Sequence, residues 1–257
     1  MKRISEWNKE RWDNASGWRG YLIENEKIRL EDRVIAVIRL LEPNIGAAFL
    51  DIGCSDGMLT SIYAQKIGAS TLCGVDICRS EAALKRGIDL KAVDLNDSPL
   101  PFPDLFFDRI TICETLEHLV DPEAALEEIR RVLKPDGAAI ISVPRADSKL
   151  AIASLVLGFQ PPGLECSLRK RYGSIAGSGS EPSGHMSHFT KKAFFEMIRA
   201  AGFVIDRFEQ RSLSSGWKLA RKANGKAIGL IEQIIFFIYD LLPFKQDVMI
   251  VRIKKHL

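Results

Sequence analysis

The stretch Phe49-Leu-Asp-Ile-Gly-Cys-Ser-Asp-Gly57 decides the fold of this 257-residue chain. It predicts a buried strand that ends in acidic Asp51 and runs into a turn built around two glycines. Glycine lets a backbone adopt left-handed dihedrals and pass close to a ligand. A second acidic residue, Asp76, closes the next apolar run about 20 positions later, a spacing suited to holding ribose hydroxyls. The pattern predicts a nucleoside bound at the carboxyl edge of a parallel sheet.

A dinucleotide site is a weaker interpretation of the same stretch. The dinucleotide fingerprint G-x-G-x-x-G needs three glycines, but Ser55 and Met58 stand at the second and third glycine positions. The turn therefore lacks the glycines that would let its backbone approach a pyrophosphate closely. The charge of Asp51 just before the turn also disfavours a phosphate and suits an ammonium group.

A hydrolase is a second alternative, because Gly53-Cys-Ser-Asp-Gly57 matches the G-x-S-x-G nucleophile elbow. Ser55, Asp108 and His185 follow one another in the chain order that such a triad needs. This order is easily met by chance in a chain of this length, and the interpretation leaves the strand-end aspartates unexplained. We therefore rank it well below the nucleoside site.

Strands alternate with helices along most of the chain, which indicates a parallel sheet with helices on both faces. After residue 144 the alternation is interrupted twice before it resumes. The expected strands are 47–52, 71–76, 90–93, 107–113, 138–143, 203–209 and 247–253, and the expected helices are 26–42, 57–67, 80–86, 122–133 and 190–201.

With these motifs in view, the chain resembles the class I S-adenosylmethionine-dependent methyltransferases. The resemblance implies a Rossmann-like, doubly wound, mostly parallel seven-stranded α/β sheet with an antiparallel last strand. Its pieces occur in order at strand and helix spacing: Leu50-Asp-Ile-Gly-Cys-Ser-Asp-Gly57, Gly74-Val-Asp-Ile77, Ala92-Val-Asp-Leu95, Phe107-Asp-Arg-Ile110, Glu114-Thr-Leu-Glu-His118, Ile129-Arg-Arg-Val-Leu-Lys-Pro-Asp-Gly137, Ile140-Ile-Ser-Val-Pro144 and Gly184-His-Met-Ser-His-Phe-Thr190.

The resemblance implies S-adenosyl-L-methionine as cofactor and assigns roles to three aspartates at successive strand ends. Asp51 would bind the methionine amino group, Asp76 the two ribose hydroxyls, and Asp94 the adenine amino group. Each aspartate alone is better explained by turn chemistry than by a ligand. Three together at the carboxyl edge of one sheet indicate a ligand.

The same resemblance adds six further cofactor residues. Gly53 and Gly57 would let the backbone lie against the cofactor, and Ser55 replaces the commoner glycine between them. The others are Ile77 packing on the adenine, the Leu95 backbone N–H at a ring nitrogen, and Glu114 near the methionine end.

Three histidines are candidate catalytic residues, because imidazole has a pKa suited to a general base. His118 lies near the methyl-transfer edge by resemblance, although it serves equally well to fix its loop. His185 and His188 stand in a later loop, where they would contact the acceptor or join a nearby carboxylate at a metal. Two histidines without an assured third ligand are weak evidence for zinc, so we expect no metal.

Two parts surround the predicted core. Residues 1–46 are expected to form an N-terminal helical lid segment, in which Trp18 and Tyr21 close over the cofactor. Residues 47–257 form the methyltransferase domain, and its insertions 147–188 and 212–245 make an acceptor cap. We expect a small-molecule, lipid or sugar-type acceptor. The alternative is a nucleoside-binding protein that has lost catalysis and acts as a regulator or assembly partner.

The net charge and the composition limit the kinds of binding partner that we expect. A net charge of +3 and a basic cluster without interleaved aromatics give no nucleic-acid footprint. The basic and apolar stretch 218–242 is expected to be buried, against the cap or in a homodimer, with peripheral membrane contact as the alternative. Five cysteines, none in a C-x-x-C pair, fit a reducing cytoplasm.

Overall fold

The computed structural model describes residues 21–24, 27–161, 163–174, 182–211 and 247–256. Expectations for Trp18 and for the segments 212–245 and 218–242 therefore lie outside the described residues. In the part of the chain that is described, no helix is both long and apolar enough to span a bilayer.

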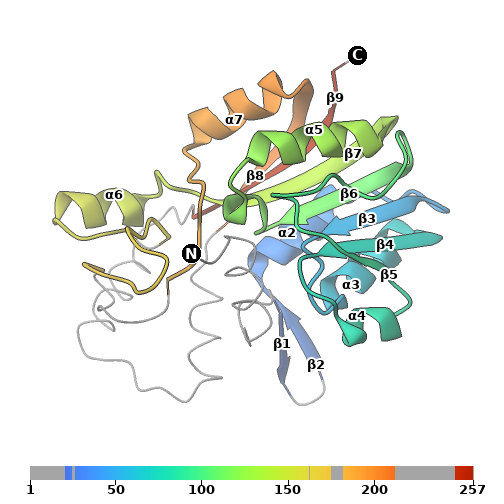
Figure 1. The fold of residues 1–257 in the computed structure, drawn as a ribbon, viewed down its shortest axis with the longest axis horizontal. Coiled ribbons are helices and arrows are strands. Elements are labelled where there is room, and N and C mark those ends of the chain that lie inside the picture. The colour runs from blue at the N-terminus through green and yellow to red at the C-terminus, as the bar shows by residue number, and fades with distance from the viewer. Residues whose placement is uncertain (1–20, 25–26, 162, 175–181, 212–246, 257) are drawn as a thin grey trace.

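A single mixed sheet organises the molecule (Figure 1). Within the described residues its seven strands lie in the order β5–β4–β3–β6–β7–β9–β8, and only β9 runs antiparallel to the other six. The predicted fold class is therefore confirmed. The strands are β3 (Ala48–Ile52), β4 (Thr71–Asp76), β5 (Asp89–Ala92), β6 (Phe107–Cys113), β7 (Leu133–Pro144), β8 (Phe203–Arg211) and β9 (Val248–Lys255).

The chain order reverses beside β3, which lies between β4 and β6 in the sheet. At such a switch point the loops leaving adjacent strands diverge to opposite faces, and this opens a crevice at the carboxyl ends of the strands. The glycine turn that follows β3 lies at this crevice. The topology therefore places the decisive sequence stretch where a ligand is expected.

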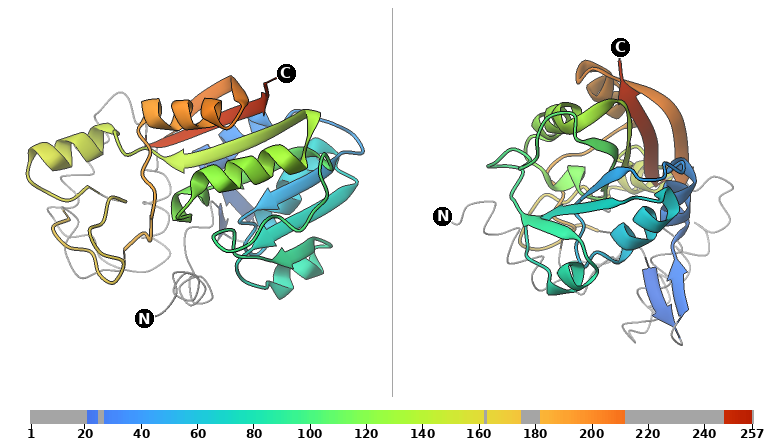
Figure 2. Two further views of the ribbon diagram at one scale, coloured as in Figure 1. Left: turned by 45° about the horizontal axis from the view of Figure 1, so that its top comes forward. Right: turned by 90° about the vertical axis from the view of Figure 1, so that its right-hand side faces the viewer.

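Helices cover both faces of the sheet, as two views of the ribbon show (Figure 2). Side chains alternate along β3, so Phe49 packs in the core beneath one face while Leu50 and Ile52 pack in the core beneath the other. The helices are α2 (Asp32–Leu40) and α3 (Met58–Ile67) on the Phe49 side, α5 (Pro122–Val132) and α7 (Lys191–Ala200) on the other, and the shorter α4 (Glu81–Lys85) and α6 (Lys149–Val156).

The expectation of a helix over 26–42 is wrong at its N-terminal end. Strands β1 (Tyr21–Glu24) and β2 (Lys27–Leu30) form an antiparallel hairpin, and α2 begins only at Asp32. The alternation Lys-Ile-Arg-Leu over 27–30 has the period of a strand, but its two apolar residues also fit the helical stripe that follows. Pairing with residues 21–24 in the hairpin decides in favour of the strand.

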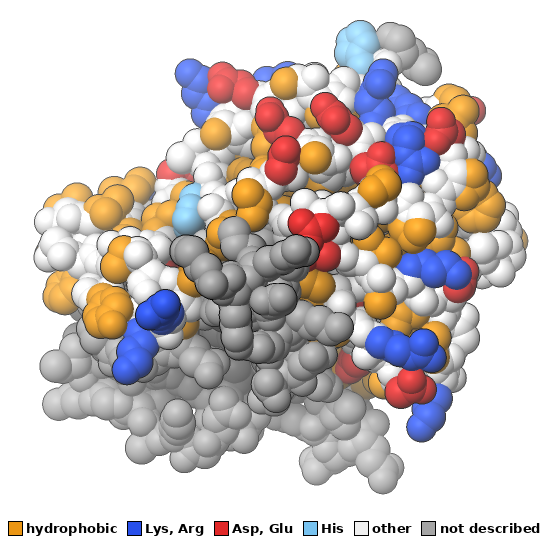
Figure 3. All heavy atoms as spheres, in the orientation of Figure 1, with side chains coloured by type: hydrophobic (Ala, Val, Ile, Leu, Met, Phe, Trp, Pro, Cys, Tyr) orange, Lys and Arg blue, Asp and Glu red, His pale blue; other side chains and the backbone are white. Residues whose placement is uncertain are grey.

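The 147–188 insertion carries α6 at the end of the molecule away from β4 and β5 (Figure 1). Apolar side chains gather over this helix in the space-filling view (Figure 3). Ile152, Leu155 and Val156 of α6 are half-exposed or more. The described part of the insertion therefore presents an apolar surface beside the carboxyl edge.

Candidate functional site

Asp51 is buried inside the sheet rather than standing at its rim. Its two carboxylate oxygens accept hydrogen bonds from the Thr60 and Thr111 hydroxyls, each at 2.6 Å, and only 5% of the residue is exposed. Burial raises the pKa of this carboxyl to about 6, although the two hydroxyl bonds oppose the shift. Asp51 thus fastens β3 to α3 and β6.

The turn after β3 needs left-handed backbone at three positions, Gly53 (φ 80°), Ser55 (φ 50°) and Gly57 (φ 75°). Glycine adopts this region freely, whereas serine does so at a cost. Ser55 therefore preserves the shape of the turn despite replacing the commoner glycine. Its backbone N–H donates to Asp76 Oδ2 at 2.8 Å, which holds the strained residue in place.

The two glycines of the turn also make room for the protein itself. A Cβ on Gly53 would lie 2.1 Å from Thr115 Oγ1, and a Cβ on Gly57 would lie 2.3 Å from Ile88 Cδ1. Side chains at these positions would collide with neighbours that hold the loop. The sequence interpretation, which credited the glycines with left-handed dihedrals and access for the ligand, missed this packing role.

Asp76 lies at the end of β4 and faces the glycine turn. Besides Ser55 it accepts from the Cys78 N–H, at 3.1 Å through Oδ1. Ile77 follows and is half-buried. The Asp76 backbone carbonyl in turn accepts from Val93 at the end of β5 at 2.8 Å. These bonds align the ends of three adjacent strands along one edge.

Asp94 has an unsatisfied acceptor. One carboxylate oxygen accepts from the Asn96 backbone and side chain, at 3.0 and 2.9 Å. The other, Oδ2, is buried and has no hydrogen-bond partner among the described residues. Buried polar atoms are normally paired, so an orphaned oxygen of this kind fits a ligand that brings a donor. Leu95 beside it is half-buried and packs against the main core.

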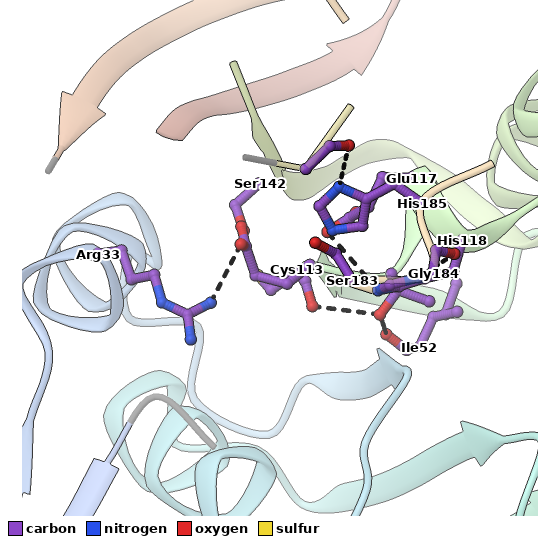
Figure 4. Close-up of polar contacts among 12 residues, drawn as sticks. Arg33, Ile52, Cys113, Glu117, His118, Ser142, Ser183, Gly184 and His185 are labelled. Atoms are coloured by element: carbon purple, nitrogen blue, oxygen red, sulfur yellow. Dashed lines mark hydrogen bonds and ion pairs between the residues drawn. The ribbon is translucent and has the colours of Figure 1, made fainter. Parts of the chain in front are cut away.

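Glu114 follows β6 with a strained left-handed φ of 53°. Its carboxylate accepts from the Ser142 hydroxyl at 2.8 Å and lies 3.4 Å from the guanidinium of Arg33 on α2 (Figure 4). Non-glycine residues in this region cost free energy and cluster at functional sites. Arg33 was missed by the sequence interpretation. The signal was present, because Arg33 shares its helix face with buried Val37 and Leu40.

Of the two residues expected to close over the cofactor, Tyr21 is the one that the structure describes. It is buried, and its hydroxyl donates to the carboxylate of Asp56 in the glycine turn. The hairpin is therefore tied to the turn across a sequence separation of 35 residues.

The structure gathers two of the candidate histidines around a buried carboxylate. His118 belongs to a short 3-10 helix, η1 (Leu116–His118), directly after the Glu114 turn. Its ring lies 5.0 Å from that of His185, and His118 Nε2 lies 3.9 Å from Glu117 Oε1 (Figure 4). His188 lies farther out, with its ring 6.5 Å from the His185 ring. Glu117 was not anticipated from the sequence.

Glu117 is 1% exposed, and neither of its carboxylate oxygens has a hydrogen-bond partner among the described residues. Burial raises its pKa well above the usual value, and the nearby charge of Glu114 adds to the shift. Such a carboxylate is costly to keep in an apolar core unless something pairs with it.

The segment 182–189 is fastened onto η1 by several hydrogen bonds. The Met186 and Ser187 N–H groups donate to the Glu117 carbonyl at 2.7 and 3.0 Å, and the Ser187 hydroxyl donates to the Leu119 carbonyl at 3.0 Å. These contacts bring the end of the 147–188 insertion to the carboxyl edge of the sheet. They explain why the histidines meet although the chain separates them by 67 positions.

The hydrolase alternative fails on geometry. Asp108 lies at the start of β6, where it accepts from Lys134 and from the N–H of Ala48 at the start of β3. Because β3 and β6 are parallel, this is the edge of the sheet opposite to Ser55. The two residues therefore cannot share a catalytic triad.

The model of the family described as methyltransferase domain matches residues 26–207, well over half of the chain. The chain therefore belongs to this family of methyltransferases. The class I S-adenosylmethionine-dependent methyltransferase fold and cofactor class predicted from the motifs are confirmed.

Individual relatives agree with this assignment. An uncharacterized methyltransferase of Schizosaccharomyces pombe is 35% identical over 101 residues, which cover 34% of this chain and 36% of that protein. A ubiquinone biosynthesis O-methyltransferase of Paracidovorax citrulli is 28% identical over 179 residues, covering 63% and 71%. The match thus spans little more than a third of the first relative's length.

A solved structure shares the fold. The 1,6-didemethyltoxoflavin-N1-methyltransferase of Burkholderia thailandensis, with bound 1,6-didemethyltoxoflavin and S-adenosylhomocysteine, has a TM-score of 0.51 at 16% identity. The similarity covers 98% of this chain and 84% of that chain. At this identity it bears on the fold alone.

Proposed function

We propose that the protein transfers a methyl group from S-adenosylmethionine to a small-molecule acceptor, with a lipid-like or sugar-bearing molecule included in that class. S-adenosylmethionine supplies a methyl group already activated on a sulfonium sulfur. The chain therefore has to bind, align and exclude water rather than provide strong acid–base chemistry.

The cofactor half of the proposal rests on Asp94, whose buried Oδ2 has no donor in the part of the chain that the structure describes. In this proposal Asp94 accepts from the adenine amino group, Asp76 from the ribose hydroxyls, and Asp51 faces the methionine ammonium. The Gly53–Gly57 turn lies under the methionine and adenosine parts, Ile77 and Leu95 flank the adenine, and Glu114 borders the methionine end. Each group present fits what that part of the ligand requires.

The acceptor half of the proposal rests on the hydrogen bonds that hold segment 182–189 against η1. Because Thr115 packs against Gly53, η1 adjoins the glycine turn, and the histidines beside it border the methyl-transfer edge. A segment closed over this edge suits a compact acceptor better than a polymer. The relatives named above include an enzyme of ubiquinone biosynthesis, which supports the same class. His118 and His185 are the nearest groups to hold an acceptor hydroxyl, with His188 behind them.

Calorimetric titration with S-adenosylhomocysteine tests the cofactor half. Wild type should bind one equivalent, and Asp94→Asn should bind roughly tenfold more weakly, because the amide can turn a donor toward the adenine amino group. Asp97→Asn is the matched control, since Asp97 lies three positions away and is exposed. Absence of heat in wild type would overturn the proposal.

Transfer of a labelled methyl group tests the acceptor class. The protein is incubated with methyl-labelled S-adenosylmethionine and a cell extract, which is then separated by size. Label in the low-molecular-weight and lipid fractions is the expected result. Label confined to nucleic acid or protein would show that the acceptor class is wrong while leaving the cofactor assignment intact.

A further inference from the structure

The cluster of Glu117, His118 and His185 has the composition of a metal site. One ligand atom from each residue lies within 4.8 Å of the other two. Two imidazoles and a carboxylate form a donor set typical of catalytic zinc, in which the fourth position stays open. In tetrahedral zinc sites the ligand atoms lie about 3.4 Å apart, so a modest contraction would complete the site.

The hydrogen bonds around the two histidines fix which nitrogen faces the cluster. His118 Nδ1 contacts the Gly184 carbonyl at 3.0 Å, and His185 Nδ1 contacts the Gly163 carbonyl at 3.1 Å. A carbonyl oxygen can only accept, so each Nδ1 carries the proton. In a neutral ring the lone pair then lies on Nε2. Donation of the far N–H to a backbone carbonyl is the usual arrangement of a metal-bound histidine.

The carboxylate supplies the independent observation. Glu117 is almost fully buried, and both oxygens lack a hydrogen-bond partner among the described residues. Its Oε1 lies 3.9 Å from His118 Nε2, which is too far for a hydrogen bond. When the neutral His118 ring carries its proton on Nδ1, Nε2 is an acceptor, as is the carboxylate oxygen that it faces. A cation between these two groups would pair with both of them.

We propose that Glu117, His118 and His185 bind one zinc ion beside the methyl-transfer edge. This inference rests on the proposed function, because the role of the ion depends on the acceptor. The open fourth position would hold a hydroxyl oxygen of the acceptor, and the ion would lower the pKa of that hydroxyl. Two ligands come from η1 and one from the 182–189 segment, so the ion would also join the insertion to the core.

The test measures metal binding directly on the full chain. Protein stripped with a chelator is titrated with zinc chloride in competition with a chromophoric chelator. Wild type should bind one equivalent, and His118→Ala, His185→Ala and Glu117→Gln should each lose roughly 100-fold or more in affinity. Cobalt substitution adds a spectroscopic readout, since tetrahedral Co²⁺ gives visible absorption bands that Glu117→Gln should abolish.

Two histidine variants serve as controls. His256→Ala removes an exposed histidine far along the chain from the cluster and should leave the zinc affinity unchanged. His188→Ala should also retain binding, because His188 lies outside the cluster. Loss of binding in His188→Ala with retention in His118→Ala would overturn the assignment, as would wild type that binds no zinc. Binding of S-adenosylhomocysteine, measured separately, distinguishes this failure from failure of the proposed function.

Discussion

The two halves of the proposed site are built in different ways. On the donor side the polar groups are held from within the sheet and its turns, Asp94 by Asn96 and Asp76 by Cys78 and Ser55. On the acceptor side His118 meets Gly184 across 66 positions. The donor side is therefore fixed once the strands of the sheet have paired and their turns have formed. The acceptor side exists only after the insertion has packed onto η1.

This difference has a chemical counterpart. The donor side must recognise one invariant ligand, which a rigid edge of successive strand ends does well. The acceptor side must suit one particular acceptor, and a long insertion can vary without disturbing the sheet. Changes on the two sides should accordingly affect different measurements.

The largest effect is expected from His118→Ala. Loss of a group that holds the acceptor, directly or through the proposed zinc ion, should lower kcat by roughly 10²- to 10⁴-fold. The affinity for S-adenosylhomocysteine should stay within about twofold, because the donor side is held independently. Steady-state kinetics and calorimetry on the same preparation check this. A parallel fall of kcat and cofactor affinity would show that the two halves are not separate.

The second effect concerns the stability of the donor side. Gly53→Ala forces a Cβ into left-handed backbone and against Thr115, whereas Gly87→Ala has a similar φ of 78° but open space. The backbone term costs about 1–2 kcal/mol in both variants. Overpacking should cost Gly53→Ala about 1–3 kcal/mol more in the free energy of unfolding. Denaturant titration measures this, and equal losses would show that the Thr115 contact relaxes freely.

The contrast between the halves also explains what the sequence predicts well. The strand-end aspartates and glycines are identifiable because strand, turn and ligand group lie within one short stretch, and the structure lines up all three strand ends. Glu117 escaped because only tertiary packing reveals what its side chain faces, whereas Arg33 was missed although the helical pattern places it on the buried face of its helix. The hairpin at 21–30 escaped because its strand pattern competes with a plausible helix.

A third prediction concerns Asp76. Asp76→Ala should weaken S-adenosylhomocysteine binding by about 1–3 kcal/mol, or roughly 5- to 150-fold, because the ribose hydroxyls and the Ser55 N–H lose their acceptor. Asp89→Ala is the control, since this exposed carboxylate lies at the opposite end of β5. Calorimetry measures both variants. Unchanged affinity in Asp76→Ala would reduce this carboxylate to a strand terminator.

The smallest effect is a pH dependence that arises from Asp51. Its pKa is raised to about 6, so the carboxyl becomes protonated as the pH falls below 6. A methionine ammonium favours the ionised form, so S-adenosylhomocysteine affinity should be full above pH 7 and fall by up to about tenfold at pH 5. Asp51→Asn, which keeps the size of the side chain, should remove this dependence.

The stability of the free protein should respond to the same group in the opposite direction. A raised carboxyl pKa means that the folded state holds the proton more tightly than the unfolded chain does. The contribution of Asp51 to stability is therefore present below pH 4 and is lost as the pH rises toward 6. Unfolding free energies measured across this range should show a weaker loss in Asp51→Asn than in wild type. If wild type and variant share both profiles, Asp51 carries its charge throughout and only fastens the strand.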